Sequence, residues 1–374
     1  MDEAGDATIE EAQGGIEVGK AKIILGYGMR AIQLVGPGIV ELAELPIPSI
    51  GPGELLLEMR ACGLCGSDLG KIFGEMPLGR PVPLGHELVG VVKAVGEGVQ
   101  RFALGDRLAV AHHVPCGRCR YCRHGSESMC PQFKATNIDP GGFAEFVRIP
   151  ALQIEQTAFA LPEELPDEAG IFMEPLACAV RAVKRSDVKV GDQIMVVGAG
   201  CMGLLVAQTI AAFGARPICV DLREERLELA RTLGVEATLN VAGSDPLMAL
   251  RSVTEENGID GAILTAVNAP MLEAVLGVLR AGGKINIFAD AGDAGRMAID
   301  LSAFYRRELS LTATYSATPV ELGEAIQLLA SGKIQTFPLI SHRFDLSRFD
   351  EGARLQREGQ ATKVLFLPAV VSTS

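Results

Sequence analysis

The stretch from Gln193 to Asp221 constrains the fold of this chain more than any other. It begins with the apolar run QIMVV, continues into GAGCMG with glycines at 198, 200 and 203, and ends with a second apolar run at Asp221. This order is typical of a β-strand, a tight turn, a buried α-helix and a second strand parallel to the first. We therefore expect a doubly wound α/β sheet built around this unit.

The same stretch predicts a dinucleotide-binding site. The first glycine permits a tight turn, the second lets the backbone approach a pyrophosphate, and the third lets helix and strand pack closely. A plain buried turn is the alternative interpretation of these glycines. A carboxylate follows at Asp221, eighteen residues after Gly203, where it would bond the ribose hydroxyls. The expected cofactor-binding residues are Gly198, Gly200, Cys201, Met202, Gly203, Asp221 and Arg226.

Asp221 also bears on the choice between NAD and NADP. Its negative charge would repel a 2′-phosphate, so the sequence favours NAD. Arg223 and Arg226 follow closely and weaken this preference, because either cation could pair with a phosphate. A helix that starts with arginine and glutamate is more often simply exposed to solvent, and we expect NAD.

The rest of the chain shows two kinds of pattern. From 181 to 314 apolar runs of strand length alternate with helical runs, as in a Rossmann domain. From 29 to 180 short apolar runs are separated by gaps too short for a helical crossover, which predicts an antiparallel β domain. Residues 315–374 end in strand-like runs and are expected to return to that β domain. Residues 1–28 are acidic and glycine-rich, and we expect an N-terminal extension.

A lobe at residues 112–131 of the predicted β domain contains four closely spaced cysteines. Two, two and seven residues separate consecutive members of the set, which is Cys116, Cys119, Cys122 and Cys130. Four thiolates complete a tetrahedral shell and leave no open position, so this spacing predicts a structural zinc. An iron–sulfur cluster is the competing ligand, and a packed group of inert thiols is the third possibility.

A second candidate metal site is spread along the chain. Cys65 in CGLCGSDL and the pair His86–Glu87 in GHE carry atoms that bind zinc, although the pair lies twenty-one residues or more from the cysteine. A buried thiol and a hydrogen-bonded core histidine are the ordinary interpretations of such residues. Glu174 precedes Pro175 at the start of a helical run, and it is either a further ligand or a residue that favours the helix dipole.

Charge and composition narrow the range of partners. The formal net charge of −12 at pH 7 argues against nucleic acid and anionic membranes, because both favour a basic protein surface. A small soluble ligand is expected instead. We see no basic segment leading into an apolar core at the start of the chain, so the cytoplasm is the expected location. The uncharged run 193–215 reaches the length of a membrane span, but its glycines divide it into strand, turn and helix.

Together, CGLCGSDL, GHELVGVVKAVGEGV, the four-cysteine lobe and GAGCMG with Asp221 resemble the zinc-dependent medium-chain alcohol and polyol dehydrogenases. The resemblance runs from about residue 29 to 368. It implies a GroES-like, mainly antiparallel catalytic domain interrupted by a Rossmann domain, one catalytic and one structural zinc per chain, NAD, and a homodimer or homotetramer. It also implies that Cys65, His86, Glu87 and Glu174 surround the catalytic zinc. Ser67 would pass a proton to solvent, although a serine there also suits a turn cap.

The resemblance also narrows the substrate. Glu174 stands where simple alcohol dehydrogenases have a cysteine, and in this it is similar to sorbitol and other polyol or sugar dehydrogenases. This implies hydride transfer from a secondary alcohol of a polyol, cyclitol or sugar. Gly70 departs from many relatives, which have a histidine there, and it counts against threonine as substrate. Lys71 beside it supports a phosphorylated sugar as an alternative hypothesis.

Three other functions compete with this one. A reductase of simple aldehydes or ketones would be expected to carry cysteine in place of Glu174. A nucleotide-binding member of the family without turnover would be expected to have lost one of the four candidate ligands. A zinc-finger binding module is indicated by the cysteine lobe alone. We expect an enzyme, because Cys65, His86, Glu87 and Glu174 are all present.

Overall fold

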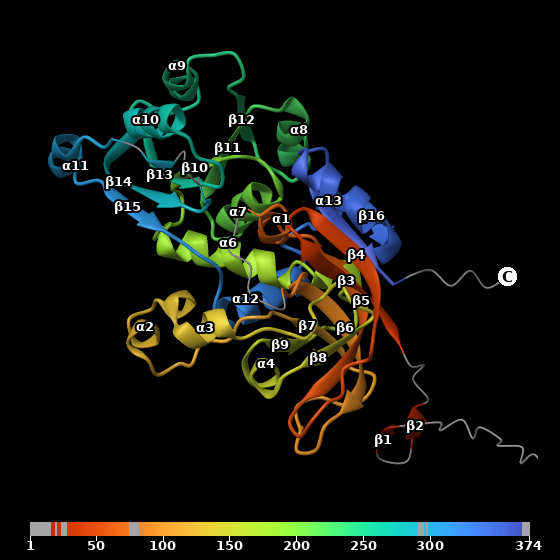
Figure 1. The fold of residues 1–374 in the computed structure, drawn as a ribbon. Helices are drawn as coiled ribbons and strands as arrows, with labels where there is room; N and C mark the ends of the chain where they lie inside the picture. The colour runs from red at the N-terminus through yellow and green to blue at the C-terminus, as the bar shows by residue number, and fades with distance from the viewer. Residues whose placement is uncertain are drawn as a thin grey trace, which may run out of the picture.

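The computed structural model describes residues 28–74, 82–290, 295–296 and 298–368, and the backbone of 16–18 and 21–23. The chain first builds an antiparallel β unit, then a parallel α/β unit, and finally returns to the first (Figure 1). The predicted N-terminal extension lies outside the described residues, apart from Gly28 and the antiparallel pair β1 (Ile16–Val18) and β2 (Ala21–Ile23).

A seven-stranded sheet forms the antiparallel unit. Its order is β16-β17-β5-β6-β7-β9 with β8 paired to β5, and only β16 and β17 run parallel to each other. The strands are β5 (Leu55–Gly63), β6 (Glu87–Val95), β7 (Arg107–Val110), β8 (Phe146–Ile149), β9 (Ala158–Ala160), β16 (Ile340–Asp345) and β17 (Lys363–Leu367). The hairpin β3 (Met29–Gly36) and β4 (Ile39–Leu45) lies beside this sheet. The C-terminal strand β17 pairs with β5 of this sheet.

Short helices connect and flank the strands of the antiparallel unit. They are α1 (Gly66–Ile72), α2 (Arg120–Arg123), η1 (Glu127–Met129), α3 (Pro131–Ala135), α4 (Ala151–Gln156), α5 (Asp167–Gly170), η3 (Phe337–Leu339), η4 (Leu346–Arg348) and α13 (Phe349–Arg357). Three of them, α2, η1 and α3, form the cysteine lobe, which protrudes from the body of the molecule in Figure 1.

A six-stranded parallel sheet forms the second unit, in the order β12-β11-β10-β13-β14-β15. Its strands are β10 (Gln193–Val197), β11 (Arg216–Asp221), β12 (Ala237–Asn240), β13 (Ile259–Leu264), β14 (Leu279–Ile287) and β15 (Ser310–Ala313). Its helices are α7 (Cys201–Ala212), α8 (Glu224–Thr232), α9 (Pro246–Arg251), α10 (Ala269–Val278) and α11 (Leu301–Arg307). Strand order reverses beside β10, and the predicted doubly wound sheet is confirmed.

One long helix couples the two units. All residues of α6 (Met173–Arg185) from Met173 to Val183 are buried, and α6 packs on α7 and on α12 (Pro319–Ala330). The same hydrophobic core contains Val89 of β6 and Leu204 of α7. The predicted boundary between residues 180 and 181 falls inside α6, and the domain limits stay predictions.

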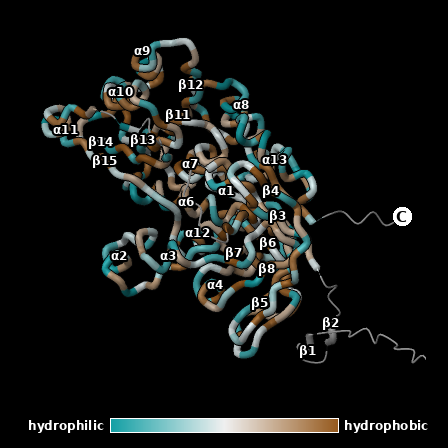
Figure 2. Tube along the Cα trace, in the orientation of Figure 1, coloured by the Kyte–Doolittle hydropathy of each residue, from teal (hydrophilic) through white to brown (hydrophobic). Residues whose placement is uncertain are grey.

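Hydropathy follows this arrangement. In Figure 2 the strands of both sheets are largely hydrophobic, whereas the outer helix α8 is hydrophilic and buries only Leu227 and Ala230. Among the described residues, no helix combines the length and apolar character that crossing a bilayer requires.

Candidate functional site

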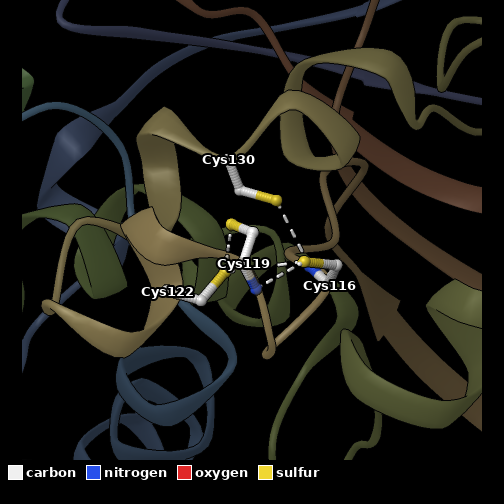
Figure 3. Close-up of side chains that lie close together, drawn as sticks. All are labelled: Cys116, Cys119, Cys122 and Cys130. Carbon is white, nitrogen blue, oxygen red and sulfur yellow. Dashed lines mark hydrogen bonds between the residues drawn. The ribbon is translucent and has the colours of Figure 1, made fainter.

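The four lobe cysteines converge on one point. Their sulfur atoms all lie within 4.8 Å of one another, with Sγ of Cys119 3.5 Å from Sγ of Cys122 (Figure 3). Backbone amides also point at the sulfurs, since the Cys119 amide donates to Cys116 Sγ at 3.3 Å and the Cys116 amide to Cys130 Sγ at 3.4 Å. The backbone amides of Arg118 and Cys119 lower the pKa of the Cys116 thiol to about 6. The donor set therefore suits a tetrahedral metal that binds thiolates.

The lobe has only a small hydrophobic cluster of its own. Its own core consists of Cys122, Cys130 and Phe133, with Cys116 and Cys119 packed against them. Without a cation, four converging sulfurs cannot all be thiolates, and burial raises the pKa of Cys122 to about 12. The sequence prediction of a structural zinc is consistent with this geometry.

We expect Cys130→Ser to lower the bound zinc by one ion per chain and to unfold the lobe locally, because the metal replaces a hydrophobic core there. Metal analysis and hydrogen exchange across residues 112–131 measure the two effects. Cys219→Ser changes an equally buried thiol in β11, far from the lobe in sequence, and should retain all the zinc. Unchanged zinc content in Cys130→Ser would contradict the assignment.

A second convergence brings together Cys65, His86 and Glu87, whose donor atoms also lie within 4.8 Å of one another. Cys65 is the residue at the N-terminal cap of α1, and Glu87 is the first residue of β6. Gly85 turns the chain ahead of them with φ of 80°, and a Cβ there would lie 2.8 Å from the Phe143 amide nitrogen. The turn at Gly85, directly before His86 and Glu87, therefore requires glycine.

Asp68 positions this cluster and was missed from sequence. It is fully buried, and its carboxylate accepts hydrogen bonds from the amides of Gly85 at 3.0 Å and Cys65 at 3.3 Å. Its Oδ1 also lies 3.5 Å from Nδ1 of His86, beyond good hydrogen-bond geometry but close enough to interact as a charge. Burial opposes the charge on His86, yet Asp68 and Cys65 raise its pKa well above the ordinary value. A carboxylate behind a ligand histidine orients the ring and makes it more basic.

Lys363 was also missed, and it changes the interpretation of Glu87. Its Nζ lies 2.8 and 2.7 Å from the two carboxylate oxygens of Glu87, and both side chains are almost fully buried. Lys363 also donates to the Leu64 carbonyl at 3.1 Å. Glu87 is therefore part of a buried ion pair as well as a neighbour of Cys65 and His86. No local sequence signal could have found a partner 276 residues away.

Glu174 lies in the first turn of α6, as predicted, and is buried. Its carboxylate is not one of the donor atoms that fall within 4.8 Å of one another, although charges on His86 and Glu87 act on it. Burial raises its pKa, and the Cys178 thiol donates to its Oε1 at 3.6 Å. Ligation of the metal by Glu174 stays a prediction. Cys178, one helical turn further along α6, lies in the hydrophobic core and is the hydrogen-bond partner of Glu174.

Two further imidazoles, those of His112 and His113, pack behind His86 with their rings tilted relative to one another. The His112 ring lies 4.5 Å from the His86 ring, centroid to centroid, and 3.6 Å from that of His113. His113 Nδ1 lies 2.7 Å from the Thr136 carbonyl oxygen, next to the lobe. Burial lowers the pKa of His112 well below the ordinary value, so this ring packs against His86 in its neutral form.

Both units line a cavity of about 1120 Å³. Ser67 and Gly70 of α1 line it from one side, and Phe288 and Tyr315 from the other. Ser67 is half-buried, lines the cavity and stands two residues after Cys65, so its hydroxyl can meet a substrate near the cluster. Lys71 is not a lining residue, and its Nζ donates to the Pro83 carbonyl at 3.1 Å. The arrangement gives no support to the hypothesis that Lys71 selects a phosphorylated sugar.

The glycine turn is shaped as a dinucleotide cradle. Gly198 has φ of 92°, and a Cβ on Gly203 would lie 1.7 Å from the Gly198 carbonyl oxygen. A Cβ on Gly200 would meet nothing within 4 Å, which leaves open space at the N-terminus of α7. Cys201 and Met202 form the first turn of this helix. Thr265, missed from sequence, donates through Oγ1 to the carbonyls of Val197 and Gly198 at 2.9 Å and fixes the turn.

Asp221 ends β11 beside this cradle. Its carboxylate accepts from the amides of Ala199 at 2.7 Å and Arg223 at 3.0 Å, and Nη1 of Arg226 lies 3.5 Å from its Oδ2. Gly198, Gly200, Gly203, Asp221 and Arg226 are thus brought together as predicted. Arg223 turns away to pair with Glu225 and the Gly359 carbonyl.

Alanine substitutions at Gly203 and Gly200 should separate an effect on stability from an effect on NAD binding. We expect Gly203→Ala to destabilise the protein by about 1–3 kcal/mol, because the new methyl overpacks the turn. Gly200→Ala should leave stability unchanged and weaken NAD binding, since its methyl fills the space left for the pyrophosphate. Thermal unfolding and NAD titration measure the two effects. Wild-type NAD affinity in Gly200→Ala would place the pyrophosphate elsewhere.

Two family models match the chain. Residues 51–162 match one described as alcohol dehydrogenase GroES-like domain, and residues 201–331 match one described as zinc-binding dehydrogenase. The first match covers much of the antiparallel unit with both cysteine-containing clusters. The second begins at α7 and covers most of the parallel unit.

Relatives in sequence and structure agree with these matches. A sorbitol dehydrogenase of Bacillus subtilis is 31% identical over 350 residues, which cover 91% of this chain and 97% of the relative. An L-threonine 3-dehydrogenase of Deinococcus radiodurans is 30% identical, with 90% and 97% covered. A solved structure described as a short chain alcohol dehydrogenase of Escherichia coli CFT073, complexed with NADH, has a TM-score of 0.81 at 26% identity, with 91% and 100% covered.

Proposed function

The chain belongs to the zinc-dependent medium-chain dehydrogenase family, and from this membership and its site we propose that it oxidises a secondary alcohol of a polyhydroxy compound with NAD. Zinc and NAD fit the residues present: donor atoms converge at Cys65, His86 and Glu87, and the glycine cradle leaves room for a pyrophosphate. When bound, the metal acidifies the substrate hydroxyl and the nicotinamide accepts the hydride.

The protein's own groups hold and orient the reactants. Cys65 and His86 would hold the metal, and Asp68 holds the His86 ring from behind. Lys363 balances the charge of Glu87, so the cluster does not carry an unpaired buried carboxylate. Ser67 Oγ lies at the cavity wall, where it can accept the proton of the substrate hydroxyl and release its own to solvent.

The proposal depends most on one observation, the convergence of Cys65, His86 and Glu87 next to a cavity lined by Ser67. The polyhydroxy substrate is supported by the buried carboxylate of Glu174 near this cluster and by the likeness to sorbitol dehydrogenase. We also propose Glu174 as a group that approaches the metal or its bound water. A non-catalytic NAD-binding protein is the competing function.

NADH production distinguishes the two. The purified zinc-loaded protein is supplied with NAD and with polyols, cyclitols, sugars, sugar phosphates, threonine and simple alcohols. Turnover on one polyhydroxy class, lost on chelation and restored by zinc, is the expected result. Absence of turnover on the whole panel, with zinc and NAD still bound, would favour the non-catalytic alternative.

Asp221 supports NAD over NADP, because its carboxylate would face a 2′-phosphate at close range. We expect Asp221→Asn to raise kcat/KM for NADP relative to NAD by roughly tenfold, the effect of removing about 1.4 kcal/mol of charge repulsion. The amide keeps the size of the carboxylate and one acceptor for the Ala199 and Arg223 amides. A wild-type ratio in this variant would mean that Arg226 already neutralises the carboxylate.

We further propose a homodimer or homotetramer in the cytoplasm. Family membership supports the assembly, and the acidic net charge supports a small-molecule partner and argues against nucleic acid or an anionic membrane. Light scattering coupled to size-exclusion chromatography measures the assembly.

A further inference from the structure

Helix α6 presents a polar stripe that the proposed mechanism uses only at one end. Glu174, Cys178, Arg181 and Arg185 follow one another at intervals of four, three and four residues, so they share one face of the helix. Glu174 lies near the metal cluster. Arg181 follows Glu174 by seven residues, which corresponds to roughly 10 Å along the helix axis.

Arg181 is buried, and only some of the hydrogen-bond donors of its guanidinium group have acceptors among the described residues. It is 4% exposed, and its buried Nη1 has no hydrogen-bond partner within the part of the chain that the structure describes. Its Nη2 makes long contacts, 3.3 Å to the Gly125 carbonyl and 3.4 Å to Glu127 Oε2. A buried guanidinium donor without an acceptor is costly, and native proteins rarely leave one without a reason.

A second arginine stands at the same end of the cavity. Arg185 lines the cavity with Arg181, and Nε of Arg185 donates to the Ala313 carbonyl at 3.3 Å. Among the described residues no carboxylate forms an ion pair with Arg185. The hydroxyl-bearing residues Ser126 and Ser128 line the cavity beside the arginines, and Asp290 is the acidic residue among the lining residues.

Anchoring the cysteine lobe explains only part of this arrangement. The contacts of Nη2 with Gly125 and Glu127 tie α6 to the lobe, but they leave Nη1 unused and do not involve Arg185. Two guanidinium groups beside a substrate-sized cavity, in a protein of net charge −12, are the donor set that carboxylates and phosphates require.

We propose that Arg181, with Arg185 at the rim, binds a carboxylate or phosphate carried by the substrate at the end remote from the oxidised hydroxyl. This inference rests on the proposed function and specifies its substrate class as an acidic polyhydroxy compound. The spacing along α6 suits a sugar-sized chain whose reacting carbon lies at the Glu174 end. Arg181 is a specificity residue in this proposal, and it takes no part in the hydride or proton transfer.

Three matched substrates test the proposal on the zinc-loaded protein with NAD: glucitol, glucitol 6-phosphate and gluconate. We expect kcat/KM for one of the two anions to exceed that for glucitol by roughly ten- to hundredfold, the range for a hydrogen bond to a charged group. The anion that gains distinguishes phosphate from carboxylate. Arg181→Gln should remove the advantage, so that kcat/KM for the preferred anion falls to about that for glucitol.

Two control variants accompany Arg181→Gln, and they are Arg181→Lys and Arg343→Gln. Lysine keeps the charge without the planar fork, so it should retain part of the advantage and guards against a folding defect in Arg181→Gln. Arg343 pairs with Glu168 on the surface, and its substitution should leave all three rates unchanged. Equal rates for glucitol and both anions in the wild type would overturn the proposal while leaving the dehydrogenase function intact.

Binding provides a readout that does not require turnover. Inorganic phosphate and acetate are titrated into the NAD-loaded protein, and the shift in unfolding temperature is recorded. A shift that disappears in Arg181→Gln, on a protein inactive with every substrate, would keep the anion site and reject the proposed dehydrogenase function. No shift and no turnover would reject both.

Discussion

Replacing Lys363 by methionine should lower the free energy of unfolding by about 3–5 kcal/mol, because it leaves the Glu87 carboxylate buried without a partner. The Nζ of Lys363 meets both carboxylate oxygens, and the two side chains are 4% and 1% exposed, so water cannot replace the lost contact. Urea unfolding of the zinc-loaded protein, followed as a shift of the midpoint, measures the loss.

The double variant Lys363→Met with Glu87→Gln is the matched control. It removes both charges, so much of the lost stability should return even though the ion pair is absent. Lys363→Arg keeps the charge and should lie close to the wild type. A single variant as stable as the wild type would show that Glu87 gains another cationic partner, with the bound metal as the first candidate.

Substituting Cys65 by serine should reduce turnover by on the order of a thousandfold or more, which corresponds to several kcal/mol of transition-state stabilisation supplied by the metal. Bound zinc should fall by one ion per chain, since the cysteine lobe keeps its own set of four thiols. NAD affinity should be retained, because the glycine cradle lies in the other unit of the fold.

Initial rates, metal analysis and NAD titration on the same preparation measure these three quantities together. Cys219→Ser again provides a buried thiol outside both clusters and should keep the zinc and the turnover. Unchanged turnover in Cys65→Ser would remove the catalytic metal from the proposed function. Loss of NAD binding together with turnover would indicate a general folding defect instead.

Prediction from sequence succeeded where the information is local. The glycine turn at 198–203 and the lobe at 112–131 each lie within some twenty residues or fewer, and backbone conformation or ligand spacing is encoded directly in the neighbouring residues. The alternation of strand and helix predicted the parallel sheet for the same reason. These stretches also carried the resemblance to the family, which the relatives confirmed.

Side-chain direction was the first thing that sequence could not provide. Lys71 and Arg181 are both cations near candidate site residues, yet Lys71 donates to the Pro83 carbonyl while Arg181 lines the cavity and has a buried Nη1 with no partner among the described residues. The sequence gives the type of a residue and its position along the chain. Its hydrogen-bond partners depend on which other segments pack around it in the folded protein.

Neighbouring residues along the chain were enough to predict the two kinds of unit, the structural metal lobe, the dinucleotide cradle and the candidate ligands Cys65 and His86. Three contacts became visible only in the folded chain: Lys363 neutralises Glu87 across 276 residues, Asp68 stands behind His86, and Arg181 lines the cavity. The physical reason is that buried charges must find partners when the chain folds, and in this fold the partner of Glu87 comes from a strand near the other end of the chain.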